Sequence, residues 1–342
     1  MTLRVLRSGM LATVQDLGRP GMQHLAIVPG GAMDAVSHLV ANALVGNVGD
    51  AATLEIALAG PDLAFECDAL VALHGARFEP TLDAARMPVS RPVLVKAGAK
   101  LRIGRALAGT FGYLAVAGGI DVPPVLHSRS TYLPGAFGGW RGKAVTAGGK
   151  LPLADDAAAI AAARYRRLAR GGRTVAVGAV ASSVRWSAPL LTLSFTEPAI
   201  MRVLDGVHAE AFDDASREAF LAASWRVLPE SNRMGYRLSG PALALAAPRE
   251  IVSQPVCLGT VQVPSDGQPI VLMADRQTTG GYPRIAEVAS ADVPRFAQVA
   301  PGTTVRFERV PLEAADAARE QLARRVRDLT ERLRWEFHDE VH

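Results

Sequence analysis

The feature that most limits the fold of this chain is the close spacing of its short apolar runs. In the first half these runs are separated by glycine, proline and polar residues, and they occupy residues 53–58, 62–66, 69–75, 92–98, 100–104 and 111–119. Runs this short, with so little chain between them, favour antiparallel strands over alternating strands and helices. We therefore predict a mainly β protein with flanking helices (α+β), built from antiparallel sheets or barrels.

The same spacing continues in the second half, and helices are predicted at four places. Strand-like runs occupy residues 173–180, 199–206, 224–230, 236–245, 251–263 and 270–275. Helical periodicity occurs at residues 33–47, 154–170, 213–223 and beyond Pro311. Asp34 is the candidate N-cap of the first helix. The last helix carries an apolar stripe that we expect to dock on its own domain, formed by Leu322, Val326, Leu329, Leu333 and Phe337.

Two pairs of similar segments indicate an internal duplication. Residues 58–65 (LAGPDLAF) resemble residues 238–245 (LSGPALAL), and residues 97–103 (AGAKLRI) resemble residues 301–307 (PGTTVRF). A length of 342 residues also suits two domains better than one. We predict two related β-rich domains at 1–153 and 171–311, a helical linker at 154–170 and a C-terminal amphipathic helix at 312–342.

Charge, hydropathy and cysteine content exclude several classes of protein. The net charge is +4, but basic residues are spread among acids and rarely cluster with aromatics, which argues against nucleic-acid binding. No run approaches the roughly 18 apolar residues of a membrane helix, and the N-terminus lacks a signal-peptide core, so we expect a cytoplasmic protein without membrane contact. Cys67 and Cys257 lie in apolar runs and are predicted to be buried, reduced thiols.

Two polar clusters in the first half contain residue types that a plain turn does not require. Arg19 precedes Pro20-Gly21, a stiff turn that would hold its guanidinium in place, although an exposed turn residue fits the same pattern. Arg129 lies between two serines, the second being Ser130. A guanidinium flanked by hydroxyls suits a carboxylate or phosphate ligand, and a capped turn is the alternative.

The strongest signal is the polar sequence DRQTTGG that follows the apolar run 269–273. Asp275 at a strand end suits a general base, a metal ligand or the partner of an arginine. The neighbouring Gly280 and Gly281 would let a ligand approach main-chain N–H groups, as in anion-binding nests. Arg233, in the segment SNRMG, is a further candidate for binding an anion. A polar loop without a ligand remains the alternative.

Several motifs are absent from the sequence. It contains no Walker A motif, no strand-anchored GxGxxG, no HExxH, no zinc-spaced Cys and His set and no GxSxG elbow, so no metal site is predicted. A Met-Lys-Met segment for covalent biotin is also missing. Chemistry that consumes a nucleotide would therefore need a partner chain.

Taken together, the clusters resemble those of the biotin-dependent carboxyltransferase family, also called allophanate hydrolase subunit 2. The resemblance runs from about residue 3 to residue 310 and includes VQDLGRPGMQHLAIVPGGAMD, SRSTYLPGAFGG, SNRMGYRLSGP and VLMADRQTTGGYPRIAEV. It implies a pair of cyclophilin-like β-barrel domains and an active site shared with a partner similar to allophanate hydrolase subunit 1. One departure is GKAVTAGGK at residues 142–150, where the family pattern differs.

The resemblance implies one component of an ATP-dependent complex that opens the 5-oxoproline lactam to give glutamate, together with subunits A and B, the second of which is the partner just described. ATP would act in the complex rather than on this chain alone, and no covalent biotin is expected. Two alternatives remain: a carboxyltransferase that moves a carboxyl group from carboxybiotin to urea or another amide, and a regulator that sequesters a partner resembling a kinase inhibitor.

The site residues implied by the family motifs fall in both halves of the chain. Asp275 is expected to act as a base or orienting carboxylate, and Arg276 and Arg233 as charge stabilisers. On this basis Asp275→Ala should abolish activity while leaving the thermal midpoint nearly unchanged. The expected substrate-binding residues are Gln277, Thr278, Thr279, Gly280, Gly281, Tyr282, Arg129, Ser130, Arg19 and Gln262.

Overall fold

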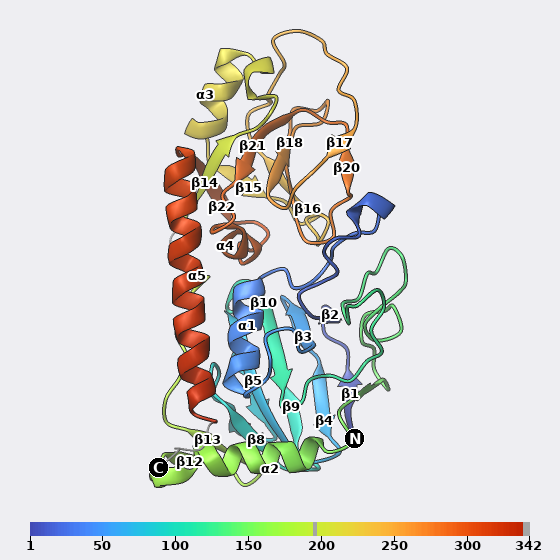
Figure 1. The fold of residues 1–342 in the computed structure, drawn as a ribbon, viewed down its shortest axis with the longest axis vertical. Coiled ribbons are helices and arrows are strands. Elements are labelled where there is room, and N and C mark those ends of the chain that lie inside the picture. The colour runs from blue at the N-terminus through green and yellow to red at the C-terminus, as the bar shows by residue number, and fades with distance from the viewer. Residues whose placement is uncertain (194–196, 338–342) are drawn as a thin grey trace. The chain divides into compact units, whose positions relative to one another are not determined.

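The structure, a computed structural model, describes residues 1–193 and 197–337 and divides the chain into two compact units. The first unit contains Met1–Arg19, Asp34–Leu193 and the chain from Arg325. The second contains Pro20–Met33 and the chain from Ser194 to Arg324. Strands dominate both units (Figure 1), which confirms the predicted mainly β class.

Two antiparallel sheets form the first unit. The first has the order β11 (Lys150–Pro152), β1 (Thr2–Arg7), β4 (Asp62–Phe65), β9 (Lys100–Arg102), β6 (Thr81–Leu82), β7 (Ala85–Arg86). The second has the order β12 (Thr174–Val177), β13 (Ala181–Val184), β8 (Val93–Val95), β5 (Ala69–Arg77), β10 (Ala108–Val116), β3 (Thr53–Ala57), β2 (Leu11–Gln15). One apolar core draws fully buried residues from both sheets, such as Leu3 and Ile56.

Helix α1 (Ala35–Leu44) packs against β5 and β10 of the second sheet (Figure 1). Its predicted N-cap is confirmed, since the Asp34 carboxylate accepts a hydrogen bond from the Ser37 backbone N–H at 3.0 Å. With the core on one face and this helix on the other, β5 is buried along almost its whole length. That explains why its sequence is continuously apolar rather than alternating. Helix α2 (Ala157–Leu168) and the 3-10 turn η2 (Arg170–Gly172) follow β11.

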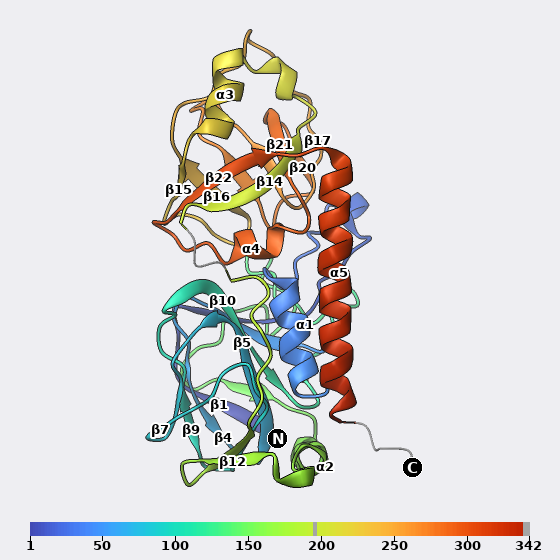
Figure 2. The same cartoon turned by 90° about the vertical axis from the view of Figure 1, so that its left-hand side faces the viewer.

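The second unit is a closed barrel with the order β14 (Ala199–Asp205), β21 (Arg284–Val288), β18 (Thr260–Gln262), β19 (Ile270–Leu272), β16 (Gly235–Ser239), β15 (Trp225–Val227), β22 (Thr304–Arg309). Helix α3 (Asp214–Ala222) packs against β22 (Figure 2), where the Phe220 and Phe307 rings stack at 4.6 Å. Beside the barrel strands, β17 (Gln254–Pro255) and β20 (Thr279–Gly280) form a separate two-stranded ribbon. The remaining short elements are η1 (Gln23–Leu25), η3 (Ala209–Ala211) and α4 (Val293–Ala297).

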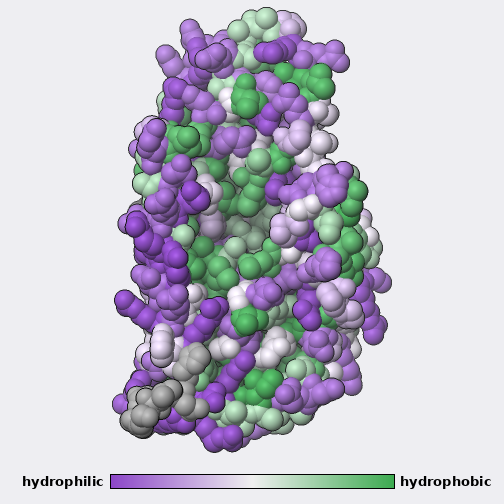
Figure 3. Space-filling view, viewed as in Figure 1, coloured by the Kyte–Doolittle hydropathy of each residue, from purple (hydrophilic) through white to green (hydrophobic). Residues whose placement is uncertain are grey.

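Helix α5 (Leu312–Trp335) is long, and its outward side is hydrophilic along the edge of the view in Figure 3. Its C-terminal end belongs to the first unit, where Leu333 and Phe337 of the predicted stripe are buried. Phe337 is buried and its ring would lie 3.0 Å from a side chain placed at Gly46. The Arg173 and Glu336 side chains form an ion pair at 3.2 Å. No helix among the described residues is long and apolar enough to cross a membrane.

The unit boundaries differ from the predicted domain boundaries. Strands β12 and β13 lie beyond residue 171, yet β13 pairs with β8 of the first unit, placing Ala181 opposite Val95. Residues 20–33 belong to the second unit although they lie near the start of the chain. Both differences arise from contacts between segments distant in sequence, which a local pattern does not report. The predicted repeat also diverges locally, since residues 62–65 form β4 whereas Leu245 makes only an isolated bridge.

The two cysteines lie in different environments. Cys67 is buried as predicted, and burial raises the pKa of its thiol. Cys257 is exposed, so the prediction of a second buried thiol is wrong. Its apolar flanks, Pro255-Val256 and Leu258, belong to the connection around β17 rather than to a core strand.

Two buried histidines in the first unit predict a loss of stability in acid. Desolvation lowers the pKa of both His38 and His74 from 6.5 to about 4. The unfolded chain therefore binds more protons than the folded chain between these pH values, so stability falls as the pH falls from 6.5 to 4. The full effect is on the order of 3 kcal/mol per histidine below pH 4.

Urea unfolding curves measured at several pH values would test this prediction. In a chain with His74→Gln, stability should depend less on pH between 6.5 and 4. The exposed His24 is the matched control, and His24→Gln should leave the slope unchanged. Equal slopes for all three chains would contradict the prediction.

Candidate functional site

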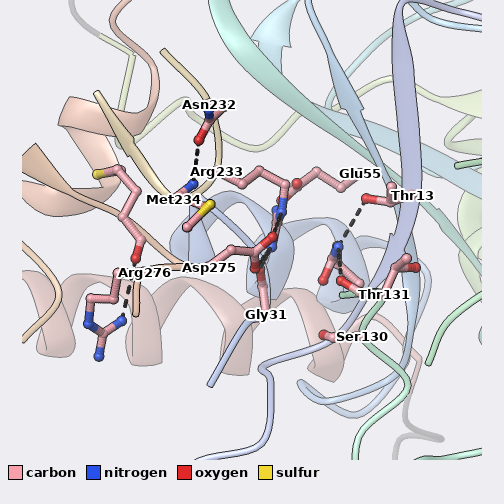
Figure 4. Close-up of polar contacts among 12 residues, drawn as sticks. Thr13, Gly31, Glu55, Ser130, Thr131, Asn232, Arg233, Met234, Asp275 and Arg276 are labelled. Carbon is pink, nitrogen blue, oxygen red and sulfur yellow. Dashed lines mark hydrogen bonds and ion pairs between the residues drawn. The ribbon is translucent and has the colours of Figure 1, made fainter. Parts of the chain in front are cut away.

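The buried pair of Arg233 and Asp275 is the centre of the candidate site in the second unit. Their exposed fractions are 5% and 2%. The guanidinium forks onto the carboxylate, with Arg233 Nε donating to Asp275 Oδ2 at 2.8 Å and Nη2 donating to Oδ1 at 2.9 Å (Figure 4). Planar, two-point pairing of this kind is strong and fixes the orientation of both groups. The structure thus brings together two residues that are distant in sequence and that the motifs had singled out separately.

Further hydrogen bonds link the three segments of the second unit that contain Gly31, Arg233 and Asp275. Arg233 follows β15, and its Nη2 also donates to the Gly31 carbonyl at 2.6 Å. Asp275 follows β19, and its backbone N–H donates to the Arg233 carbonyl at 2.8 Å. The pair therefore fixes the start of the loop after β19. Of the two roles expected for Asp275, this geometry suits the orienting carboxylate, because its charge is already neutralised by Arg233.

Arg276, in this loop, and Gln262 each have a buried donor atom without a hydrogen-bond partner. Arg276 is half-buried, its Nε is buried without a partner, and desolvation lowers the pKa of its guanidinium. Its Nη1 makes a long contact of 3.5 Å with the Met273 carbonyl. Gln262, on β18, is 2% exposed and its Nε2 also lacks a partner. Buried donors without partners are costly, so such groups often mark places where a ligand completes the hydrogen bonding.

The rest of the loop is accessible and partly strand-like. Gln277, Thr279 and Tyr282 are exposed, and Thr278 is half-buried. Gly280 pairs with Gln254 in the β17–β20 ribbon, and the Val256 backbone N–H donates to the Thr278 carbonyl at 3.1 Å. Neither Gly280 nor Gly281 has a positive φ. The two glycines therefore do not form the anion-binding nest that the sequence had indicated.

Glycine is needed at position 280 because a neighbouring side chain leaves no room for a Cβ, not because of the backbone conformation there. A Cβ at this position would lie 2.4 Å from Gln262 Nε2 and 3.1 Å from Gln277 Nε2. We expect Gly280→Ala to displace the Gln262 amide and to lower stability by about 1–3 kcal/mol, measured by urea unfolding. At Gly281 the nearest atom is the Ser253 hydroxyl at 3.2 Å, so Gly281→Ala is the milder control. Equal losses for both variants would rule out the clash with Gln262 as the cause.

The candidate residues of the first unit are organised around a carboxylate that the sequence analysis missed, that of Asp16. Asp16 lies just after β2 and is buried. Its Oδ1 accepts hydrogen bonds from the Ser128 hydroxyl at 2.7 Å, from the Ser130 hydroxyl and from the Gly18 N–H at 2.8 Å. Its Oδ2 accepts from the Arg129 N–H. The serine hydroxyls and the Arg129 N–H thus bind a carboxylate of the chain itself, which corresponds to the capped turn that the sequence left as the alternative to a ligand site.

The two arginines of this cluster donate hydrogen bonds to different backbone carbonyls. Arg129 is half-buried, and its Nε donates to the Val122 carbonyl at 3.0 Å. Arg19 is 2% exposed, so the alternative of an exposed turn residue is wrong. Its Nη2 donates to the Ser130 carbonyl, and its guanidinium lies 5.0 Å from the centre of the Phe137 ring. Both side chains hold backbone of the segment 122–138. The sequence signal for Asp16 was its position two residues before Gly18, a turn pattern in which Asp accepts a local N–H.

Comparisons with known proteins identify the family of this chain. The sequence matches the family described as "Carboxyltransferase domain, subdomain A and B" over residues 25–309. It is 39% identical to the C subunit of 5-oxoprolinase from Escherichia coli over 99% of both chains. It is 36% identical to the C subunit of 5-oxoprolinase from Haemophilus influenzae over 89% of this chain and 90% of the relative.

A solved structure shows the same fold. The crystal structure of the K. lactis urea amidolyase matches 96% of this chain with a TM-score of 0.84 and 29% sequence identity. This chain covers only 20% of that larger protein. Because the family match covers most of its length, the chain belongs to the family of carboxyltransferase domains with subdomains A and B.

Proposed function

We propose that this chain is the C subunit of an ATP-dependent 5-oxoprolinase, which hydrolyses the 5-oxoproline lactam to glutamate together with subunits A and B. The observation that carries the proposal is the 39% identity to the C subunit of the Escherichia coli 5-oxoprolinase, extending over 99% of both chains. The urea amidolyase relative is matched over a much smaller share of its length. Similarity across a whole protein supports a common role better than similarity to one part of a larger enzyme.

The second-unit site has groups suited to this reaction. Opening a lactam places negative charge on the carbonyl oxygen, and preorganised cationic or N–H donors stabilise that charge. Arg276 and the Gln262 amide have buried donor atoms without partners beside the loop. Asp275 and Arg233 would hold this loop in place, and the exposed Gln277 and Thr279 would contact the substrate or the partner protein. Water supplies the hydroxyl to the carbonyl carbon and a proton to the nitrogen, while ATP is hydrolysed on a partner.

A second candidate is transfer of a carboxyl group from carboxybiotin to urea or another amide. It is favoured by the TM-score of 0.84 to the K. lactis urea amidolyase. The amide substrate of this reaction also develops negative charge on oxygen, so the same donors would serve. The two functions therefore differ in the nucleophile and the electrophile of the reaction. Both need the same groups on this chain.

Glutamate release from 5-oxoproline and ATP tests the proposal. The chain is purified with its subunits A and B, and a control mixture omits it. Turnover that requires this chain supports the 5-oxoprolinase function. We expect Arg276→Gln to lower kcat by about tenfold or more, which corresponds to the loss of one charge-assisted hydrogen bond. Arg226→Gln is the matched control, because Arg226 is an exposed barrel residue outside the loop.

A lack of glutamate release would change the functional assignment. An assembled complex that releases no glutamate would refute the proposal. Carboxylation of urea by the same chain, supplied with carboxybiotin, would then assign the second function. Binding to the partner similar to allophanate hydrolase subunit 1, without either activity, would leave sequestration of that partner as the role of this chain.

A further inference from the structure

A small pocket in the first unit has one arginine and two aspartates in its lining. Its volume is about 270 Å³. Asp50 lies in the connection between α1 and β3, Asp121 lies in the turn after β10, and Arg129 lies between the two serines described above. All three residues belong to the first unit. Groups of both charge signs therefore share one small space within that unit.

Backbone hydrogen bonds fix the two turns that carry the aspartates. The Ile120 N–H donates to the Ala52 carbonyl at 3.1 Å, and the Asp121 N–H donates to the Pro152 carbonyl at 2.9 Å. Gly119, which also lines the pocket, has a φ of +82°, a conformation that favours glycine. The buried side chains of Ala52 and Ile120 give the pocket an apolar part. Its shape is thus determined by the backbone of the unit.

Arg129 is anchored by atoms other than those at the end of its guanidinium. Its backbone N–H donates to the Asp16 carboxylate, and its Nε donates to the Val122 carbonyl at 3.0 Å. Within residues 1–193 and 197–337, its Nη1 and Nη2 donate to no protein group. Two N–H groups on a planar guanidinium of fixed position match the two oxygens of a carboxylate.

Asp50 and Asp121 are both exposed. In the part of the chain that the structure describes, neither carboxylate forms a salt bridge or accepts a hydrogen bond. A primary ammonium group has three N–H donors and suits two carboxylates. The Arg129 charge disfavours a metal cation in the same space, and the two aspartates disfavour a phosphate or another polyanion. The lining therefore suits a ligand that has one carboxylate and one ammonium group.

From this arrangement we propose that the pocket binds a free α-amino acid with a small, uncharged side chain. Arg129 binds the carboxylate of the amino acid, and Asp50 and Asp121 bind its ammonium group. The side chain of the ligand lies against Ala52 and Ile120. This inference goes beyond the proposed function, because the ammonium group that the aspartates recognise is absent from the 5-oxoproline lactam.

Calorimetric titration of the full chain with L-alanine tests the proposal, at constant ionic strength. Propionate lacks the ammonium group of L-alanine, and ethylamine lacks its carboxylate. Each should bind at least about tenfold more weakly than L-alanine, which corresponds to the loss of one charge-assisted contact. Asp121→Asn should weaken L-alanine binding by about tenfold without weakening propionate binding. Asp155→Asn changes an exposed carboxylate outside the pocket and should leave both unaltered.

A variant of the arginine tests the other half of the ligand. Arg129→Lys retains the charge without the planar fork, so it should weaken the binding of L-alanine and of propionate but not that of ethylamine. These titrations need neither a partner subunit nor ATP, so their outcome is distinct from that of the glutamate-release assay. Failure of the folded chain to bind L-alanine saturably would overturn the proposal, as would an equal loss in Asp155→Asn. Tighter binding of 5-oxoproline than of L-alanine would also overturn it, because the aspartates would then recognise no ammonium group.

Discussion

Replacing Asp275 by alanine is expected to lower the free energy of unfolding by about 3–5 kcal/mol, because it leaves the Arg233 guanidinium buried without its carboxylate. Two hydrogen bonds join Arg233 to Asp275, and both side chains are almost fully buried, with exposed fractions of 5% and 2%. Removing the carboxylate loses its electrostatic attraction to the guanidinium, but the desolvation cost of the buried guanidinium remains. This differs from the small change in thermal midpoint that the sequence alone led us to expect for a loop residue.

Urea denaturation of the isolated chain measures this loss directly. Glu230→Ala removes an exposed carboxylate from the same unit and should change stability by less than about 0.5 kcal/mol. If Asp275→Ala unfolded at the same urea concentration as Glu230→Ala, the pair would not be holding the loop. Activity assays on the Asp275 variant are interpretable only at temperatures where it remains folded.

The second large effect is expected at Asp16. Its carboxylate accepts hydrogen bonds from two serine hydroxyls and two backbone N–H groups, and all four donors lose their acceptor in Asp16→Ala. Each buried donor left unsatisfied costs about 1–3 kcal/mol, although relaxation and water will recover part of the sum. We expect a total loss of about 3–5 kcal/mol, measured by urea unfolding.

An asparagine at the same position separates charge and hydrogen bonding from size. Asp16→Asn retains one acceptor oxygen but directs an amide N–H toward the hydroxyls or the Arg129 N–H. It should therefore lose less stability than Asp16→Ala but more than the control. Asp155→Ala is that control, since Asp155 is exposed at the start of the segment leading to α2. A fully stable Asp16→Ala chain would show that the segment 128–130 is held by other contacts.

Much of the candidate site was visible in the sequence, but the role of its residues was not. Local composition identified Arg233, Asp275 and the serines around Arg129 as unusual. It did not show that the first two pair with each other, because they are separated by 42 positions. Nor did it identify Asp16 as the acceptor for Ser130, which is 114 positions away. The assumption that Gly280 supplies conformational freedom failed because a buried amide, not a turn, limits that position.

The sequence by itself determined the mainly β class, the four principal helices with the Asp34 cap, and the family resemblance. These depend on periodicity, capping and short motifs, all of which act over a few residues. The tertiary structure alone decided that β12 and β13 join the first unit, that Cys257 is exposed and that the serine segment binds an internal carboxylate. Each of these depends on which distant segments meet, and burial and pairing across such distances are set by the packing of the whole unit rather than by local sequence.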